Sequence, residues 1–561
     1  MTIAGIDLGT TNSLIALWTD SGPELVANAL GETLTPSAVS IAEDGAVLVG
    51  RAAADRLITH PDRSVASFKR WMGSSAGARL AGRFYRAEEL SALVLRSLKE
   101  DAEAKLGEPI GEAVISAPAY FSDPQRKATL DAARLAGLTV ERLINEPTAA
   151  ALAHGLDSVE EGRFLILDLG GGTFDVSLLH KFDGVMEVRA SAGDSHLGGD
   201  DFRDALVALI ARRHGVNPDK LARTELARLM REAERIKHAL TAEDRAAYEI
   251  ELAGELRRGE IGRAEFEEAA QPLLRRMRAP IERTVSDARV DPQTIDQIVL
   301  VGGATRMPMA RALVARLFGR FPLIHPRPDH VVGLGAAVQA GLKARHAALA
   351  DVVMTDVCPF TLGISVRDPS APDQRTMSPL IERNAVVPIS RAGRYYTVSD
   401  NQTGIVIEVF QGENLRPAQN VKIGELRMPV PPAPAGREGV DVRFTYDVNG
   451  ALEVEVVAET TGQRERRVFR NEANLSLEEL DRRFLALAAI KAPPRDQAEN
   501  RALIARAERL YAESLGAARE HIKRLLGEFE MALAEQQLRD AAALRGGFAE
   551  ALDGFERIWP T

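Results

Sequence analysis

Two near copies of one glycine-rich turn constrain this chain more than any other feature of its sequence. The first reads Asp7-Leu-Gly-Thr-Thr-Asn12, and the second, Asp168-Leu-Gly-Gly-Gly-Thr-Phe-Asp175, follows about 160 residues later. Each turn joins two short apolar runs, which predicts a β-hairpin whose backbone N–H groups can approach an anion closely. The spacing indicates one duplicated domain, because solenoid units are only roughly 20–50 residues long.

The residues of these turns suit a polyphosphate bound together with a metal ion. A single glycine turn is usually no more than a tight hairpin, but two that face each other would contact the phosphates from both sides. Asp7, Asp168 and Asp175 would repel a phosphate, yet they can hold a hydrated Mg²⁺. A third turn, Val301-Gly-Gly-Ala-Thr-Arg306, suits close approach to a nucleoside. The chain has no G-x-x-x-x-G-K-[ST] motif, which excludes a P-loop enzyme.

Residues 1–350 alternate apolar runs, glycine turns and amphipathic stretches, which is typical of α/β layers. Each half of this region repeats strands followed by helices. Strands are expected at Ile3–Ile6, Ala113–Ser116, Phe164–Leu167 and Ile298–Val301, and helices at Ala87–Leu106, Pro124–Ala136 and Glu225–Leu240.

The composition and hydrophobic pattern of the remaining chain change twice. Residues 351–357 form an apolar linker, unlike the glycine- and serine-rich composition of flexible linkers. Residues 358–470 alternate with period two around the turn Asn449-Gly450, which predicts a β-sandwich or small barrel. Residues 471–561 are rich in Ala, Leu, Glu and Arg, and they predict helices.

Composition narrows the functional classes. With 561 residues, of which 45% are hydrophobic and 27% charged, the chain can form several packed domains. Its net charge of −10 and its scattered basic residues argue against nucleic acid or an anionic membrane as partners. Cys358 is the single cysteine, which favours a reducing compartment. No leader pattern opens the chain and no uncharged run reaches about 18 residues, so we expect a cytoplasmic protein.

The glycine turns belong to a larger set of motifs that resembles the actin, hexokinase and heat-shock chaperone superfamily. Within that superfamily, Ala117–Asp123, His196–Phe202 and the apolar linker resemble the DnaK family of seventy-kilodalton heat-shock chaperones. Phe68–Gly73 and the short C-terminal region are most similar to the specialised bacterial HscC-type branch. The five nucleotide-binding motifs are matched by Asp7–Asn12, Ile144–Ala151, Asp168–Asp175, Val301–Pro308 and Gly335–Val338.

The resemblance implies a multidomain protein. Residues 1–350 would form a two-lobed α/β ATPase with the actin-like, duplicated ribonuclease H-like fold. Residues 351–357 would be the interdomain linker, residues 358–470 a peptide-binding β-sandwich and residues 471–561 an α-helical lid. Such a protein is an ATP-dependent chaperone that binds and releases extended apolar peptides. The expected cofactors are ATP or ADP and Mg²⁺, with K⁺ as a further candidate.

The resemblance also implies a role for each motif residue. Lys69 would position the water that attacks the γ-phosphate, although by itself such a lysine is typical of a solvated surface. Glu146, Asp168 and Asp175 would organise Mg²⁺ and that water, Asp7 would help to hold the metal through water, and Thr173 would contact the phosphates. The implied nucleotide-binding residues are Asp7, Gly9, Thr10, Thr11, Asn12, Gly170, Gly171, Gly199, Glu234, Lys237, Thr241, Gly302, Gly303, Arg306 and Asp329.

The family clamps adenine and ribose with one helical stretch, which here carries Glu234, Lys237 and Thr241. Arg306 would stack on the base. Without the resemblance, the helical spacing of these charges would predict only an exposed face with salt bridges.

The apolar linker suggests how ATP controls a client. Val352, Val353 and Met354 would dock on the ATPase in one nucleotide state and be exposed in the other. A difference of ~1–3 kcal/mol in docking would change client affinity ~5–150-fold. The alternative is an ordinary interdomain strand. Arg142 and Asp356 match positions through which J-domain partners act in the family, so we expect a J-domain co-chaperone.

In the family the β-sandwich holds the client through backbone hydrogen bonds and an apolar pocket. The matching positions are Ile364, Tyr395, Val398, Ile405 and Ile407, each of which also fits plain core. A family arch residue that is often Met falls near Arg367, and a cation there favours a narrower set of clients.

The remaining predictions concern partners and rival functions. We expect a monomer that binds unfolded or extended peptides, and the need for a nucleotide exchange factor stays open. One alternative is a metabolite kinase of the same superfamily. The other is a non-catalytic protein, either a chaperone-like exchange factor or a scaffold.

Overall fold

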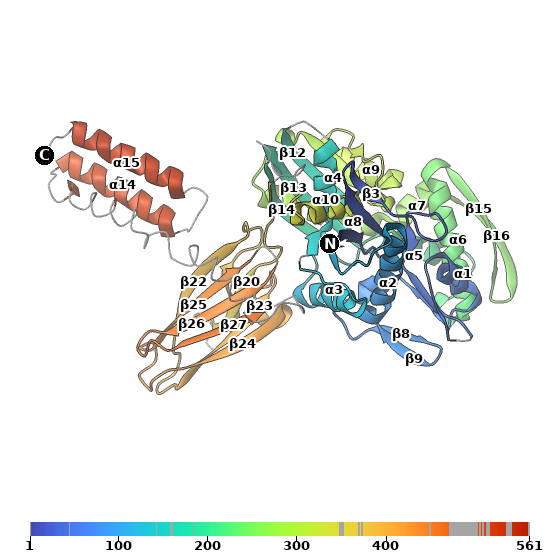
Figure 1. Ribbon diagram of the computed structural model, residues 1–561, viewed down its shortest axis with the longest axis horizontal. Coiled ribbons are helices and arrows are strands. Elements are labelled where there is room, and N and C mark those ends of the chain that lie inside the picture. Colours follow the sequence, from blue (N-terminus) through green and yellow to red (C-terminus); the bar gives the residue numbers. More distant parts are fainter. Residues whose placement is uncertain are drawn as a thin grey trace.

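The structure is a computed structural model of the chain. It describes residues 2–43, 45–141, 143–157, 161–182, 185–346, 353–368, 371, 374–447, 450–469, 503, 507, 510–511, 516–534 and 541–558. Figure 1 shows that strands and helices interleave in the first part of the chain, that only strands follow, and that helices end it.

The first lobe is built on a sheet with the strand order β11-β10-β1-β2-β3, with β4 paired to β2. Strands β1, β10 and β11 run parallel, while β2 and β3 continue from β1 as antiparallel hairpins. Helices α2 and α3 pack together and cover its core. The bounds are β1 Ile3–Asp7, β2 Asn12–Thr19, β3 Gly22–Leu25, β4 Thr35–Pro36, β5 Ala38–Ile41, β6 Val47–Val49, α1 Arg51–Thr59, β7 Ser64–Ala66, η1 Phe68–Trp71, β8 Gly77–Leu80, β9 Arg83–Arg86, α2 Ala87–Leu106, β10 Glu112–Ala117, α3 Asp123–Leu135 and β11 Leu143–Asn145.

The second lobe repeats this topology. Its sheet has the order β18-β17-β12-β13-β14, in which β12, β17 and β18 are parallel and β13 and β14 are antiparallel. The same order and directions in both sheets confirm the duplication that the glycine turns predict. The bounds are β12 Gly162–Leu169, β13 Phe174–Phe182, β14 Val185–Asp194, α5 Gly199–Arg213, η2 Pro218–Lys220, α6 Arg223–Ala242, β15 Arg245–Leu252, β16 Glu255–Gly262, α7 Arg263–Ala269, α8 Gln271–Asp287, η3 Pro292–Thr294, β17 Gln297–Val301, η4 Gly303–Arg306, α9 Pro308–Phe318 and β18 Leu323–Ile324.

Helices α4 (Glu146–Asp157) and α10 (Val331–Lys343) lie between the lobes. They pack on each other and share one core with residues of both sheets. The contact is close, because a Cβ on Gly335 would overlap the backbone of Ala149. The helix pair therefore connects the two sheets through one shared core.

The linker continues the second sheet. Its strand β19 (Val353–Thr355) runs parallel to β14 and forms the sheet's sixth strand. Of the expected linker residues, Val353 and Met354 lie on β19, whereas Val352 lies outside the described residues, as does Arg142. The linker is thus bound to the second lobe in this arrangement.

Two four-stranded antiparallel sheets follow, with the orders β21-β20-β23-β24 and β22-β25-β26-β27. They enclose one hydrophobic core, which makes this region a β-sandwich. β25 and β26 form the hairpin predicted by the Asn449-Gly450 turn. The bounds are β20 Leu362–Arg367, β21 Arg375–Ile381, β22 Ile389–Tyr396, β23 Gly404–Gln411, η6 Pro417–Gln419, β24 Val421–Pro429, β25 Gly439–Tyr446, β26 Leu452–Ala458 and β27 Arg464–Phe469.

The C-terminal region is helical where the structure describes it. Helices α14 (Gly516–Ala534) and α15 (Ala541–Ile558) lie side by side, and Phe529 stacks on Phe548 with ring centroids 4.2 Å apart. These helices have a small core of their own. Among the described residues, no helix combines the length and the apolar character that crossing a bilayer requires.

Candidate functional site

A cavity of ≈ 480 Å³ lies between the two lobes, and all three glycine-rich turns line it. Lys69, Glu146, Asp168 and Thr173 border it, whereas Asp175 is buried and does not. The cavity also gathers every residue that the sequence proposes for the nucleotide, namely Asp7, Gly9, Thr10, Thr11, Asn12, Gly170, Gly171, Gly199, Glu234, Lys237, Thr241, Gly302, Gly303, Arg306 and Asp329.

The two duplicated turns lie directly against each other. A Cβ on Gly171 would overlap the hydroxyl of Thr11, and a Cβ on Gly172 would lie 2.7 Å from Oγ1 of Thr10. Only glycine permits this approach, because any side chain there would push the turns apart. The repeated glycines therefore bring backbone from both lobes to one cavity.

Lys69 is buried rather than solvated, with 3% of its surface exposed. Its Nζ donates a 2.6 Å hydrogen bond to Oε1 of Glu146 and lies 5.6 Å from the ring centroid of Phe121. The short helix η1 holds the lysine there, because Phe68 is part of the core of the first lobe. Burial makes this cation a fixed charge inside the cavity.

The carboxylates around Lys69 carry strongly perturbed pKa values. Burial, reinforced by the charge of Glu146, raises the pKa of Asp7 to about 6 and that of Asp175 to about 8. Burial and the neighbouring carboxylates also raise the pKa of Asp168 well above its ordinary value. The cluster of buried carboxylates includes Lys69 as its one lysine, so it carries too little positive charge to balance the acids. A bound cation would reduce the repulsion between the carboxylates.

This donor set fits a hydrated Mg²⁺. Mg²⁺ prefers oxygen ligands and keeps several of its waters in proteins. Within the described parts of the chain, no three His, Cys, Asp or Glu side chains converge closely enough to hold a bare ion. The aspartates are the residues that would hold such a hydrated ion. Two of them are fixed in place, Asp7 by the Ser116 hydroxyl at 2.7 Å and Asp175 by the Tyr120 N–H at 3.1 Å.

The far side of the cavity carries paired charges on α6. Glu234 contacts Lys237 at 2.8 Å and His238 at 3.0 Å, and Lys237 also donates to the carbonyl of Gly199 at 3.0 Å. Burial alone would raise the pKa of Glu234, but the His238 hydrogen bond and the Lys237 charge lower it to about 2. This stretch lines the cavity rather than forming a purely exposed face.

Arg306 lies at the rim of the cavity, where it pairs with Asp329 at 2.6 Å. Sequence reasoning missed His238, although its i,i+4 spacing from Glu234 was a usable signal. Two further wall residues, Ala304 and Met307, lie within the third glycine-turn motif but were not singled out. The remaining wall residues carry no such signal, and they are Leu34, Pro328 and Val332.

A chain of hydrogen bonds runs from this site to the linker. Asn145 precedes Glu146, accepts a bond from Arg126, and donates to Oδ2 of Asp356 at 2.9 Å. The other oxygen of Asp356 accepts from the N–H of Val357 at 2.8 Å. Asp356 is thus hydrogen-bonded to the residue that directly precedes Glu146.

The β-sandwich contacts the second lobe through a second polar cluster. Arg383, on the loop after β21, binds both carboxylate oxygens of Asp287 on α8, at 2.7 and 2.8 Å, and also Glu413 at 2.8 Å. Asn384 contacts Asp287 at 2.9 Å and accepts from the N–H of Ser191. These hydrogen bonds raise the pKa of the Arg383 guanidinium. No sequence signal indicated the pair, because its partners lie in different domains.

The expected peptide-binding residues differ in their exposure. Ile364, Ile405 and Ile407 are buried in the core of the sandwich, and Tyr395 is partly buried against it. Val398 is 48% exposed. Arg367 is exposed at the end of β20 and donates to the carbonyl of Val398 at 3.2 Å.

Comparison with known proteins identifies the class. A cavity between duplicated lobes, lined by glycine turns and buried acids, is the site of a nucleotide-binding ATPase domain. The family model described as "Hsp70 protein" matches residues 3–80 and 75–544. The chain therefore belongs to the Hsp70 family.

Two curated relatives extend this assignment. The chaperone protein DnaK of Thermotoga neapolitana is 40% identical over 496 residues, covering 86% of this chain and 82% of the relative. The chaperone protein dnaK3 of Thermosynechococcus vestitus is 37% identical over 585 residues, covering 98% and 84%. The chain is an ATP-dependent chaperone and an ATPase of this family. Neither rival reading, a metabolite kinase or a non-catalytic scaffold, is favoured by these matches.

Proposed function

We propose that the chain binds Mg·ATP in the cavity between its lobes and hydrolyses it there. The observation that carries this proposal is the buried Lys69–Glu146 pair, which borders the same cavity as the two facing turns. Mg²⁺ would neutralise the phosphates and the acids around them. Lys69 then orients the attacking water, and Glu146 holds the lysine through their 2.6 Å hydrogen bond. Glycine backbone and the hydroxyls of Thr10 and Thr173 bind the phosphates.

The proposed domain roles follow the order of the chain. Residues 1–350 form the ATPase, residues 351–357 the linker, residues 358–470 the client-binding sandwich, and residues 471–561 the lid. Support comes from the separate cores of the lobes, the sandwich and the terminal helices. Binding of β19 to the second lobe supports a linker that reports the state of the ATPase.

The client site is the face of the sandwich around the exposed Val398, together with the partly buried Tyr395 and the core residues Ile364, Ile405 and Ile407. Arg367 bridges from β20 to the Val398 carbonyl, so a cation stands beside the exposed apolar residue. Such a site disfavours generic apolar peptides and prefers those with an acidic residue near the apolar one. This narrow preference agrees with the HscC-type branch, which we retain as the proposed subgroup.

We further propose a J-domain co-chaperone that acts at Asp356 and Arg142. The hydrogen-bonded route from Asp356 through Asn145 toward Glu146 supports this assignment. A monomer in the cytoplasm, with K⁺ as a second cation, completes the proposal.

One experiment tests the proposal as a whole. Phosphate release from ATP is measured with Mg²⁺ alone, with added extended peptides, and with a panel of sugars. Peptide-stimulated hydrolysis supports the proposal. Turnover only with a sugar would instead indicate a kinase, and no turnover under any condition would indicate a scaffold.

A further inference from the structure

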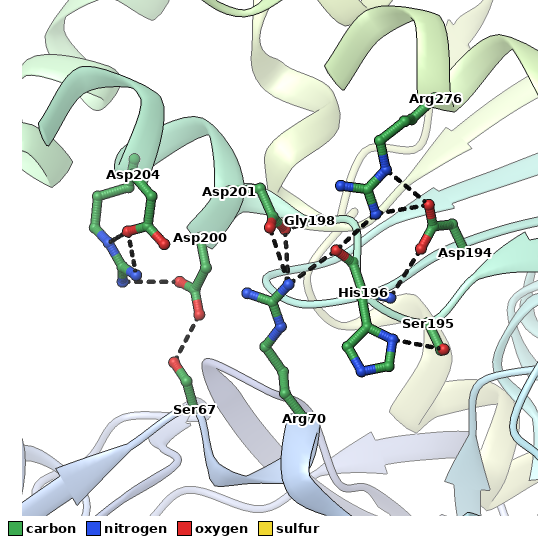
Figure 2. A network of polar contacts seen from close by, with 11 residues as sticks. Ser67, Arg70, Asp194, Ser195, His196, Gly198, Asp200, Asp201, Asp204 and Arg276 are labelled. Atoms are coloured by element: carbon green, nitrogen blue, oxygen red, sulfur yellow. Dashed lines mark hydrogen bonds and ion pairs between the residues drawn. The ribbon is translucent and has the colours of Figure 1, made fainter. Parts of the chain in front are cut away.

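A group of polar contacts joins the two lobes immediately beside Lys69 (Figure 2). Ser67 and Arg70 flank the lysine in the first lobe, and both side chains reach carboxylates at the start of α5 in the second lobe. Figure 2 shows Ser67 directed at Asp200 and Arg70 directed at Asp201. We call these four residues the interlobe latch.

The Arg70 half of the latch is tightly built. Its Nη2 lies 2.9 and 3.0 Å from the two oxygens of Asp201 and donates to the carbonyl of His196 at 2.9 Å. Both side chains of the ion pair are less than a fifth exposed, at 19% and 18%. A Cβ on Gly172 would lie 3.1 Å from Cγ of Arg70, so the arginine stem also packs against the second glycine turn. The pair is therefore partly shielded from solvent, where ion pairs are stronger than on the surface.

The Ser67 half is strained and partly buried. Ser67 has φ +57°, in the left-handed region that residues with a side chain rarely adopt. Its hydroxyl donates to Oδ2 of the buried Asp200 at 2.7 Å, and Arg203 holds the other oxygen at 3.0 Å. This strain persists only where the surroundings over-determine the conformation. The contact with Asp200 supplies such a constraint.

The second-lobe half is fixed next to the cavity. Asp201 accepts from the N–H of Gly198 at 2.8 Å, which closes the first turn of α5. Carboxylates are stabilised at this end of a helix by its dipole. Gly199, the residue before the two aspartates, borders the cavity, as Lys69 does on the other side. Each half of the latch is thus adjacent in sequence to a residue of the site.

We propose that Asp200 and Asp201 are positioning residues that hold Lys69 in its catalytic place through Ser67 and Arg70. The latch forms only when the lobes are closed, so closure and correct placement of the lysine are one event. Opening of the lobes, which releases nucleotide, then also breaks the contacts that hold Lys69 in position. This inference rests on the proposed role of Lys69.

The test uses the full-length chain and two separate measurements. Single-turnover hydrolysis of Mg·ATP reports placement of the lysine, and dissociation of Mg·ADP reports lobe opening. Asp201→Asn and Arg70→Gln should each slow hydrolysis about 10- to 100-fold, as displacement of a catalytic group does. Both should also speed ADP release. Arg70→Lys, which keeps a cation for Asp201 and the His196 carbonyl, should retain most of the rate.

A double-mutant cycle makes the inference falsifiable. If the two residues act through one contact, Arg70→Gln/Asp201→Asn is no slower than either single variant, whereas additive losses overturn the latch. Ser67→Ala is a milder second probe, and its melting curve checks that the variant folds. An unchanged hydrolysis rate in all of these variants would also overturn the latch proposal.

A matched control exists in the chain. Arg223 and Asp62 also bridge the lobes at 2.7 Å, but both are largely exposed, at 71% and 79%. Arg223→Gln should leave hydrolysis unchanged, because exposed pairs contribute little. The Lys69→Ala variant tests the proposed function independently of the latch. If this variant hydrolyses ATP at the normal rate, Lys69 has no catalytic role, whatever the result for the latch variants.

Discussion

Among the lysines that the structure describes, only Lys69 and Lys237 are buried, and Lys69 is the one that pairs with Glu146. Lys69→Ala should lower single-turnover hydrolysis by about 10²–10³-fold, because a fixed charge that acts on the transition state is lost. Affinity for Mg·ATP should change only a few-fold, because the turns and α6 remain. Phosphate release and calorimetric nucleotide binding measure the two effects. Lys127→Ala, on the exposed face of α3, is the control, and normal hydrolysis by Lys69→Ala would remove the lysine from the mechanism.

A second residue-scale prediction concerns Arg367. Arg367→Met removes the cation that donates to the Val398 carbonyl and leaves apolar surface in its place. Affinity for neutral apolar peptides should rise, and affinity for peptides with an acidic neighbour should fall, by about 2- to 5-fold for one exposed charge. Fluorescence anisotropy with a matched peptide pair measures both. Arg464→Met changes an exposed arginine on β27, at the edge of its sheet opposite β22, and an equal effect there would contradict the assignment.

A third prediction uses Cys358. Burial raises the pKa of its thiol to about 12, and its Sγ donates to the carbonyl of Phe360 at 3.1 Å. Only the thiolate reacts, and at pH 8 this thiol stays protonated and inaccessible. Reaction with a chromogenic disulfide should therefore be undetectable in the native protein and rapid in urea. Fast labelling of the native protein would show that the sandwich core opens.

At this scale the sequence predicted the glycines, aspartates and hydroxyls of the site, because their chemistry is tied to local motifs. The burial of Lys69 was not predictable from its neighbours, since it depends on Phe121 and Glu146 from distant segments. The Asp287–Arg383 pair joins residues almost a hundred positions apart and carries no motif. Charges that meet only after folding leave no signal in one sequence.

At the scale of elements, the periodic patterns located strands and helices well. The helix expected at 87–106 is α2 with the same bounds, and the strand expected at 298–301 is β17 with one more residue. Buried strands and amphipathic helices give strong periodic signals. The sequence did not decide between a docking segment and an ordinary interdomain strand for the linker. The pairing of β19 with β14 depends on a partner far away in the sequence.

Close packing of α4 on α10 gives an element-scale prediction. A Cβ on Gly335 would overlap the carbonyl of Ala149, so Gly335→Ala must separate the two helices that join the lobes. Overpacking of this kind costs about 1–3 kcal/mol, which thermal or urea unfolding measures. Gly111→Ala meets no atom within 4 Å and is the control. Equal stability of both variants would show that the helices can part freely.

At the scale of the whole molecule, the duplicated lobes were predictable because the repeated turns fix the same hairpin twice. The contact between lobes and sandwich was not, since it depends on scattered pairs such as Arg383–Asp287 and Tyr120–Phe360. Hydrogen bonds among the described residues also link the domains at Asp287, at Asp356 and between the Asp123 N–H and Gln411. The Asp356 contact is made by Asn145, which directly precedes Glu146, the partner of Lys69.

Asp356 is therefore the residue whose change should separate hydrolysis from its control. Asp356→Asn keeps the shape but presents an amide in place of one oxygen, so the bonds from Asn145 and Val357 cannot both persist. A hydrogen bond to a charged group contributes about 1.5–3 kcal/mol, enough to change coupling roughly 10- to 150-fold. Basal phosphate release should stay within a few-fold of normal, while stimulation by peptide is lost.

The measurement compares hydrolysis with and without a saturating peptide in three proteins. Asp441→Asn, an exposed aspartate paired with Arg394 on the sandwich, controls for loss of charge. Normal stimulation in Asp356→Asn would contradict the role of Asp356 and direct the search for the coupling route to Asp287, whose bonds to Arg383 and Asn384 form another link. Loss of both basal and stimulated activity would instead mean that Asp356 supports the position of Glu146 itself, because Asn145 directly precedes that residue in the chain.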